Sequence, residues 1–234
     1  MSKVSFRVGQ GEIVALLGLS GCGKSTLCLC LGGIIPHCLG GEMTGGILVN
    51  GKKTRDCPVA QLALEVGLVF QDPDTQLFLP TVEDELAFAP ENLCLPVEEV
   101  EARVGNVLTI LGINDLRYAN PKNLSGGQKQ LVALGAVLSL DPGILVLDEV
   151  MAPLDPESKK RISDAVNALR QRGKTVLVVE HDLEAVSFAD RILVLENGRL
   201  IKDGQAPDVL GEREFLLRHK LELEDELRIK RWDL

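Results

Sequence analysis

Residues 13–26 read IVALLGLSGCGKST, an apolar run followed at once by a glycine-rich loop. The run at 13–17 is bounded by Gly11 and Gly18 and is typical of a strand buried on both faces of a parallel sheet. Residues 18–25 match the pattern G-x-x-x-x-G-K-[ST], and the residues after Lys24 predict a helix over 25–31. Because a strand precedes the loop and a helix follows it, the motif stands in the context in which it binds nucleotide phosphates.

The residue types of this loop suit a phosphate group. Glycines let backbone N–H groups turn toward phosphate oxygens, and the following helix presents its positive end to the same anion. Lys24 can reach the β- and γ-phosphates, and the Ser25 hydroxyl can ligate Mg²⁺. The residues that we expect to bind the nucleotide are Gly18, Ser20, Gly21, Cys22, Gly23, Lys24, Ser25 and Thr26.

Further apolar runs predict the rest of the sheet. Residues 68–70, 144–147 and 176–179 have the same character as the first run, with helical patterns between the later ones. This alternation predicts an α/β fold with a parallel-sheet core, and together with the phosphate loop it resembles the core of a RecA-like P-loop NTPase. Apolar residues also run into Asn50-Gly51 and into Asn197-Gly198, and Asn-Gly supplies the two positive φ angles of a type I′ turn. The two hairpins predict an antiparallel β subdomain beside the parallel sheet.

Residues 76–135 show little strand pattern. Thr81 begins a predicted helix with a capping box to Asp84, and residues 98–111 predict a second helix. We therefore expect an α-helical subdomain inserted into the core over about 76–135. The domain as a whole is expected to span 1–205. A charged, leucine-rich tail over 206–234 predicts further helices.

Composition limits the function. The 234 residues include 25 basic and 34 acidic side chains, a formal charge of −9. Nucleic acid is excluded as a general partner, because neutralising phosphates needs a basic surface. The six cysteines show no C-x-x-C spacing, which argues against a zinc site and for reduced thiols. The most apolar stretch, 27–35, is shorter than the roughly 20 residues that span a bilayer, so a membrane role requires a partner.

Two more strand ends carry polar residues. Asp148 and Glu149 follow the run at 144–147. Asp148 can hold Mg²⁺ through water, and Glu149 can orient a water that attacks the γ-phosphate. The run at 176–179 is followed by Glu180, His181 and Asp182. His181 can touch the γ-phosphate or the water, although a lone histidine at a strand end is more often structural.

The chain also contains the segment Leu124-Ser125-Gly126-Gly127-Gln128. Together with the phosphate loop and the acids at 148–149, this segment resembles the signature of ATP-binding cassette (ABC) ATPases. Physically it is another anion cradle, with a hydroxyl and two glycines at the start of a helix. The resemblance covers residues 4–204 and implies the ABC ATPase fold, with ATP and Mg²⁺ as cofactors. In that family, two subunits face each other around two ATP molecules, and each signature binds the γ-phosphate of ATP held by the opposite subunit.

The resemblance also implies roles for single residues. Gln71 stands at the glutamine that senses Mg²⁺ and couples to the membrane partner, Asp155 stands in the dimer-contact loop, and His181 stands at the switch histidine. The implied catalytic residues are Lys24, Gln71, Glu149 and His181. The implied metal ligands are Ser25, Gln71 and Asp148. The further nucleotide-binding residues are Ser125, Gly126, Gly127, Gln128 and Asp155.

Within the family, residues 70–78 (FQDPDTQLF), 81–88 (TVEDELAF) and 90–93 (PENL) are similar to ATPases of energy-coupling factor (ECF) transporters. Those importers pair two ATPases, identical or different, with a transmembrane coupling protein and a substrate-binding membrane protein. They bring vitamins or transition-metal ions into prokaryotic cells, so the likeness implies a peripheral location on the cytoplasmic face of the cell membrane. The acidic residues Glu83, Asp84 and Glu85 either meet basic coupling helices or form a first turn that the helix dipole favours.

Three features of the sequence depart from the family pattern. The aromatic that stacks on adenine lies upstream of the phosphate loop, in a segment that this sequence lacks, which implies a truncated start or a loosely held base. Stacking on an aromatic is worth about 1–3 kcal/mol per base in nucleic-acid sites. We therefore expect weak ATP affinity, which low-micromolar binding in a titration would contradict. Pro153 is expected to alter the dimer-contact loop, and Leu131 replaces the usual arginine, but neither change removes a catalytic group.

Other functions fit less well. A soluble ABC ATPase of DNA repair carries a long coiled coil between loop and signature, whereas here about 100 residues without sustained heptads separate them. A translation-factor ABC protein carries two cassettes in one chain, and a P-loop kinase would not need the signature. A soluble ABC-type ATPase not engaged in transport and the ATPase of another ABC transporter class stay as alternatives, and the cargo is chosen by another chain.

Overall fold

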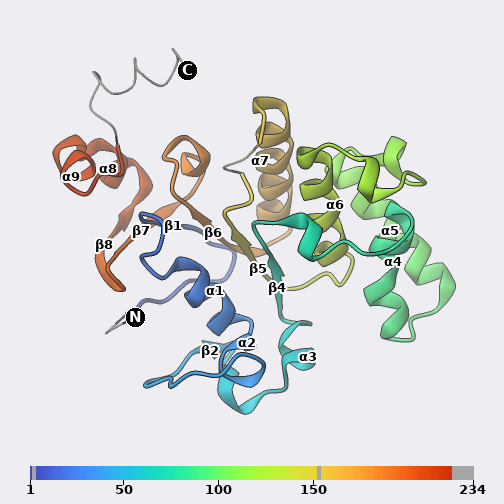
Figure 1. The fold of residues 1–234 in the computed structure, drawn as a ribbon, viewed down its shortest axis with the longest axis horizontal. Coiled ribbons are helices and arrows are strands. Elements are labelled where there is room, and N and C mark those ends of the chain that lie inside the picture. Colours follow the sequence, from blue (N-terminus) through green and yellow to red (C-terminus); the bar gives the residue numbers. More distant parts are fainter. Residues whose placement is uncertain (2–3, 152–153, 223–234) are drawn as a thin grey trace.

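The computed structural model describes residues 1, 4–151 and 154–222 (Figure 1). Its centre is a six-stranded sheet in the order β4-β5-β6-β1-β7-β8. The strands are β1 (Ile13–Leu17), β4 (Val66–Val69), β5 (Ile144–Asp148), β6 (Thr175–Glu180), β7 (Arg191–Glu196) and β8 (Arg199–Gln205). Every neighbouring pair from β4 to β7 is parallel, which confirms the predicted parallel core.

The register brings the polar strand ends to one edge of the sheet. Leu17 pairs with Glu180, and Asp148 pairs with Val179. Because parallel strands end at the same edge, the loop after β1, the acids at the end of β5 and the polar residues at the end of β6 meet there. Open α/β sheets bind their ligands outside this edge.

The two Asn-Gly turns form as predicted but belong to different sheets. Asn50 and Gly51 have φ angles of 48° and 78°, and Asn197 and Gly198 have 49° and 72°. The first turn joins β2 (Leu48–Val49) to β3 (Lys52–Lys53) in a separate two-stranded sheet. The second joins β7 to β8, and β7 also pairs with β1. The second hairpin therefore extends the main sheet, which corrects the prediction that it lies in a sheet beside it.

Helices cover both faces of the main sheet (Figure 1). They are α1 (Lys24–Leu31), α2 (Ile34–His37), α3 (Val59–Leu62), α4 (Val82–Asn92), α5 (Val97–Leu111), α6 (Gly126–Leu138), α7 (Pro156–Gln171), α8 (Ala206–Gly211) and α9 (Arg213–Arg218). Short 3₁₀ helices are Thr54–Asp56, Pro73–Thr75, Asn114–Leu116, Pro121–Asn123 and Glu184–Val186. Among the described residues, no helix has the length and apolar character that crossing a membrane requires.

Between β4 and β5, α4 begins after Thr81 as predicted, and α5 begins one residue before the predicted helix. Thr81 caps α4 by accepting a hydrogen bond from the Asp84 N–H at 3.1 Å, and the predicted helix over 98–111 is α5. A separate helical subdomain at 76–135 stays a prediction. Its predicted end at 135 falls inside α6, which continues to Leu138. In the predicted tail, α8 and α9 are helical, and residues 223–234 lie outside the described residues.

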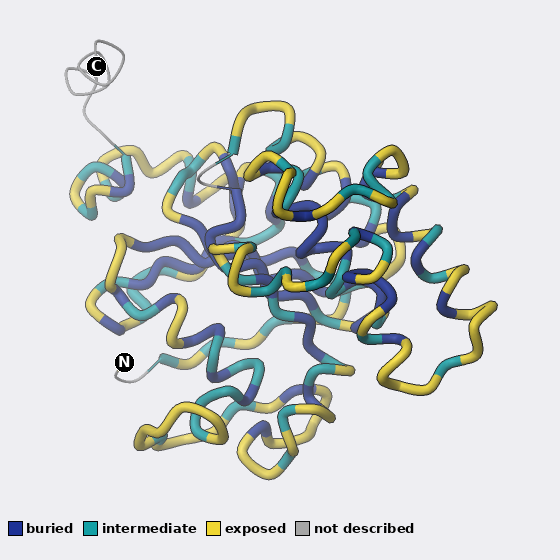
Figure 2. Tube along the Cα trace, turned by 45° about the vertical axis from the view of Figure 1, so that its right-hand side comes forward, coloured by how far each residue is buried: buried dark blue, intermediate teal, exposed yellow. Residues whose placement is uncertain are grey.

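Successive side chains of β1 enter two apolar clusters, one on each face of the sheet. Ile13, Ala15 and Leu17 join the cluster that includes residues of α4 to α7, whereas Val14 and Leu16 join residues of α1. All five are fully buried, and Figure 2 shows the buried strands running through the centre of the molecule. Burying an aliphatic side chain of Val or Leu size is worth about 1.5–3 kcal/mol. The core therefore holds the end of β1, where the phosphate loop begins, in one position.

Candidate active site

The phosphate loop runs from β1 into α1 and forms one wall of a cavity of about 290 Å³. Gly23 precedes α1 with a φ of 110°, a left-handed angle that a residue with a side chain adopts only under strain. The cavity is lined by Ser20, Gly21, Gly23, Lys24, Ser25, Thr26, Gln71 and Glu149. Of the predicted loop residues, Gly18 and Cys22 do not line it, and the Cys22 side chain is buried in the apolar cluster beside β1.

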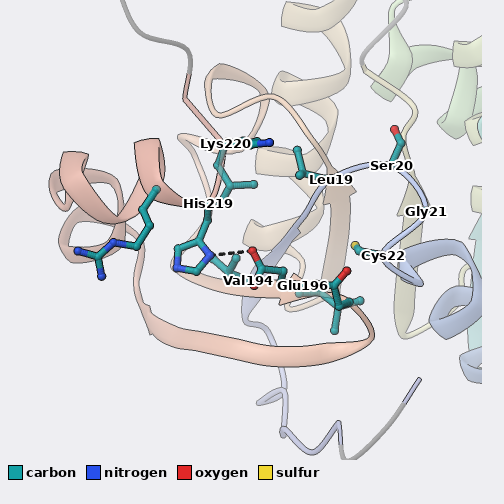
Figure 3. Close-up of a pocket in the computed structure, with 12 residues that line it drawn as sticks. Leu19, Ser20, Gly21, Cys22, Val194, Glu196, His219 and Lys220 are labelled. Atoms are coloured by element: carbon teal, nitrogen blue, oxygen red, sulfur yellow. Dashed lines mark hydrogen bonds and ion pairs between the residues drawn. The ribbon is translucent and has the colours of Figure 1, made fainter.

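The other side of the loop faces the β7–β8 hairpin and the residues after α9 (Figure 3). The Gly198 N–H donates to the Cys22 carbonyl at 2.9 Å. Nδ1 of His219 lies 2.8 Å from Oε1 of Glu196. A second cavity of about 290 Å³ lies between these elements and residues 19–22. The loop thus separates two cavities, and the hairpin anchors it through its backbone.

Lys24 is buried at the base of the first cavity. Its Nζ donates to the carbonyl oxygens of Gly18 at 2.7 Å and Leu19 at 3.3 Å. The same Nζ lies 3.0 Å from Oε1 of Glu149, and only 3% of the Lys24 side chain is exposed. The Lys24 ammonium group is therefore already held in place, so it can bind an anion that enters the cavity without losing further side-chain freedom.

Asp148 lies beside Ser25, and one of its carboxylate oxygens has no hydrogen-bond partner among the described residues. Burial raises the pKa of its carboxyl, and the hydrogen bond from the Ser25 side chain opposes that shift. Oδ1 is buried and has no hydrogen-bond partner in the described part of the chain. An unpartnered carboxylate oxygen next to a hydroxyl, with the Gln71 amide on the same cavity, is an oxygen-rich set that suits Mg²⁺.

Glu149 turns the chain sharply as β5 ends. Its φ is 51°, an uncommon angle for a residue with a side chain. Its N–H donates to the Val179 carbonyl on β6 at 2.8 Å. Oε2 lies 3.6 Å from Nδ1 of the half-exposed His181. The carboxylate thus stands between Lys24 and His181, so the three side chains predicted from separate motifs come together.

Gln71 follows β4, and two side chains hold the backbone of Phe70 directly before it. The Phe70 N–H donates to the Gln76 side chain at 2.8 Å. The Gln130 side chain on α6 donates to the Phe70 carbonyl at 3.1 Å. Gln71 is therefore linked through the backbone of Phe70 to the helix that begins with the signature.

The signature residues lie apart from the phosphate cavity of their own chain. Ser125 caps α6 and forms a capping box with Gln128: the Ser125 Oγ accepts the Gln128 N–H at 3.3 Å, and the Gln128 side chain accepts the Ser125 N–H at 3.0 Å. Ser125 and Gly126 are exposed, whereas Gly127 is buried. Asp155 caps α7 by accepting the N–H groups of residues 157 and 158, both at 3.0 Å. None of these residues lines the phosphate cavity.

The comparison with protein families matches residues 1–152 to the family described as "ABC transporter". The chain belongs to the ABC transporter family. This family hydrolyses ATP, and the parallel core, the phosphate loop and the strand-end acids of the chain agree with that activity.

Relatives and solved structures agree with this assignment. A Pyrococcus abyssi protein whose name places it among ABC transporter ATP-binding proteins is 42% identical over 231 residues, 98% of this chain and 82% of the relative. The energy-coupling factor transporter ATP-binding protein EcfA of Methanosarcina acetivorans is 40% identical over 213 residues, 91% of this chain and 76% of the relative. A Methanosarcina mazei relative is 43% identical over 220 residues, but the chain spans only 37% of its length.

Two solved structures share the fold of this ABC ATPase. The structure of cbiO1 from Clostridium perfringens, described as part of the ABC transporter complex cbiONQ, has a TM-score of 0.80 and 34% identity and covers 93% of this chain and 86% of its own. The ATP-binding cassette MJ0796, a dimer in a post-hydrolysis state bound to ADP and Pi, has a TM-score of 0.76 and 28% identity and covers 87% of this chain and 89% of its own.

Gly127 of the ABC signature touches the start of α7. A Cβ at this position would lie 2.2 Å from the Ser158 Oγ and 2.8 Å from its Cβ. Gly127→Ala is therefore expected to lower the free energy of unfolding by about 1–3 kcal/mol through overpacking. Gly126→Ala is the matched control, since a Cβ there would have no atom within 4 Å. Urea unfolding of both variants checks the prediction, and equal stabilities would contradict it.

Glu180 ends β6 directly before His181, and the sequence motifs assign it no role. It is fully buried, and its Oε1 accepts the Met151 N–H at 2.8 Å. Oε2 has no hydrogen-bond partner among the described residues. Burial raises the pKa of this carboxyl to about 7, and the carboxylates of Glu149 and Asp182 add to the effect. The available signal was an acid placed directly after the four apolar residues at 176–179.

The pKa of Glu180 predicts how stability depends on pH. A glutamate pKa of 4.5 applies to the unfolded chain, against about 7 in the folded chain. Between these values the folded chain binds more protons, so stability falls as the pH rises from 4.5 to 7 and this contribution is constant above 7. The loss is about 3 kcal/mol. Glu180→Gln is expected to remove it, and the same pH dependence in urea unfolding of both proteins would contradict the assignment.

The acidic residues at the start of α4 have partners within the chain. Glu83 accepts from the Arg117 side chain at 2.9 Å. Glu85 is buried and accepts the N–H groups of Phe78 and Leu79. Since these carboxylates are engaged, the cluster offers a basic helix less free negative charge than its sequence suggests. Of the family departures noted above, Leu131 is buried in the core, and Pro153 lies outside the described residues.

Proposed function

We propose that this chain is the ATP-hydrolysing subunit of an ECF-type importer, in which ATP binding and hydrolysis by a dimer drive the uptake of a vitamin or a transition-metal ion. The observation that carries the proposal is the division of the site. The phosphate loop, Gln71 and Glu149 line one cavity, with Asp148 beside Ser25 and His181 beside Glu149, while the signature stands outside it. The likeness to EcfA and to cbiO1 supports the ECF class within the family.

The cavity suits ATP and Mg²⁺ as cofactors. Lys24 and the N–H groups of the loop would hold the β- and γ-phosphates, with the start of α1 pointing at them. Ser25, Asp148 and Gln71 would hold Mg²⁺, directly or through water, and the unpartnered Oδ1 of Asp148 supports this assignment. Bound Mg²⁺ supplies neutralisation of the charge on the phosphate oxygens.

Glu149 is the proposed catalytic base. Its carboxylate lies on the cavity beside Lys24 and His181, where it can accept a hydrogen bond from a water and orient it toward the γ-phosphorus. Lys24 and His181 can then stabilise the charge on the γ-phosphate oxygens, since both present nitrogen atoms to the same region.

The signature and Asp155 are proposed to act across a dimer, with an identical or a different ATPase as the partner. Ser125 and Gly126 are exposed at the N-terminus of α6, which suits the γ-phosphate of ATP bound to a facing subunit. The dimeric state of MJ0796 supports this arrangement. Further proposed partners are a transmembrane coupling protein and a substrate-binding membrane protein, with this chain on the cytoplasmic face of the membrane.

The test is purification of the tagged chain from detergent-solubilised native membranes, followed by identification of the proteins that come with it. Recovery of a coupling protein and a small substrate-binding membrane protein is expected. Recovery of a transmembrane dimer of another kind would assign the chain to another ABC transporter class. Recovery of no membrane protein would favour an ABC ATPase that is not engaged in transport.

A further inference from the structure

Glu180 links the two segments that carry Glu149 and His181. It ends β6, directly before His181, and its Oε1 reaches across to the Met151 N–H at 2.8 Å. Met151 is itself fully buried and lies two residues after Glu149. The Glu180 side chain therefore joins the end of β6 to the turn that follows β5.

Backbone contacts tie the same turn at its other end. The Glu149 N–H donates to the Val179 carbonyl at 2.8 Å, so residues 149–151 are attached to β6 at both ends. The first attachment uses backbone only, whereas the second depends on one side chain. Because Glu149 has a φ of 51°, the turn needs such restraints to keep an uncommon conformation.

Packing alone does not account for a carboxyl at this position. Oε2 of Glu180 has no hydrogen-bond partner in the part of the chain that the structure describes, and an unpaired buried polar oxygen lowers stability. The charged groups that act on it are Glu149 after β5, Asp182 after β6 and Lys159 on α7. Two of these three are acids, so the surroundings disfavour a further negative charge.

We propose that Glu180 is a positioning residue for ATP hydrolysis: its bond to the Met151 N–H holds the turn 149–151 so that the Glu149 carboxylate stays between Lys24 and His181. The inference rests on the proposed role of Glu149. It does not depend on the membrane partners.

The test compares Glu180→Gln with Glu180→Leu in the full chain. Glutamine keeps a carbonyl that can accept the Met151 N–H, whereas leucine has a similar size and no acceptor. Turnover at saturating ATP and the ATP dissociation constant are measured together. Asp190→Leu is the matched control, because Asp190 also accepts a backbone N–H, that of Ile13 at 2.9 Å. Ile13 begins β1, so this contact lies at the end of the strand that is remote from the phosphate loop.

Glu180→Leu is expected to lower turnover by at least about tenfold, since small displacements of a catalytic group have effects of this order or larger. Its ATP affinity should change little, Glu180→Gln should restore most of the turnover, and Asp190→Leu should leave turnover unchanged. Full turnover in Glu180→Leu, or equal losses in both Glu180 variants, would overturn the proposal. If Glu180→Leu does not fold, Glu180→Ala takes its place with the same expected results.

Glu149→Gln, assayed in parallel, separates this inference from the role on which it rests. Full turnover in Glu149→Gln would refute the role of Glu149 itself. Loss of turnover in Glu149→Gln together with full turnover in Glu180→Leu would refute only the positioning by Glu180.

Discussion

Replacing Glu149 with glutamine is expected to lower ATP turnover by at least about 100-fold. The amide cannot accept a proton from the attacking water, while the phosphate loop that holds the nucleotide is untouched. ATP should therefore still bind and accumulate uncleaved. If the signature acts on ATP held by a facing subunit, the uncleaved nucleotide should hold two subunits together.

Steady-state phosphate release measures the loss of turnover, and gel filtration with ATP and Mg²⁺ measures the dimer. Glu98→Gln is the matched control, since it makes the same change at an exposed position on α5. Turnover of Glu149→Gln within a few-fold of the unaltered chain would contradict the role of Glu149. A variant that stays monomeric with ATP would instead count against the facing-subunit arrangement.

Replacing Lys24 with methionine is expected to weaken ATP binding by about 10–100-fold, because charge-assisted hydrogen bonds contribute about 1.5–3 kcal/mol. Methionine keeps much of the length of the side chain but cannot meet the phosphates. The substitution also removes the ammonium group of Lys24, whose Nζ lies 3.0 Å from Oε1 of Glu149 in the unaltered chain. We expect the free energy of unfolding to fall by about 1–3 kcal/mol for that reason.

A double variant separates these two effects. Lys24→Met with Glu149→Gln has neither charge, so it should recover the lost stability but not the ATP affinity. Isothermal titration and urea unfolding give the two quantities. Lys160→Met is the control, since Lys160 forms an exposed pair with Asp164 and such pairs contribute little. Full ATP affinity in Lys24→Met would contradict the proposed contact with the phosphates.

Local sequence was sufficient for the elements whose residues are close together in the chain. The apolar run at 13–17 predicts a strand buried on both faces, and β1 is buried throughout. The Asn-Gly pairs predict their turns, because positive φ angles are a property of two adjacent residues. Only the structure shows that Asn197-Gly198 closes a hairpin of the main sheet, since strand pairing depends on distant segments.

The charged residues show the same division. The motifs predict Lys24, Asp148, Glu149 and His181 as site residues, because parallel strands that end at one edge must bring their following residues together. They do not predict that Glu85 is buried, or that Glu180 reaches the Met151 N–H. Both outcomes depend on which backbone N–H groups the fold places next to each carboxylate. No local sequence pattern encodes that placement.

The sequence by itself therefore determined the strands of the parallel core, the two Asn-Gly turns and the family, since each depends on residue type and spacing along the chain. Tertiary structure decided which carboxylates are free, which are paired and which are buried. Those properties arise from contacts between segments far apart in sequence, and burial then sets their charge by removing water.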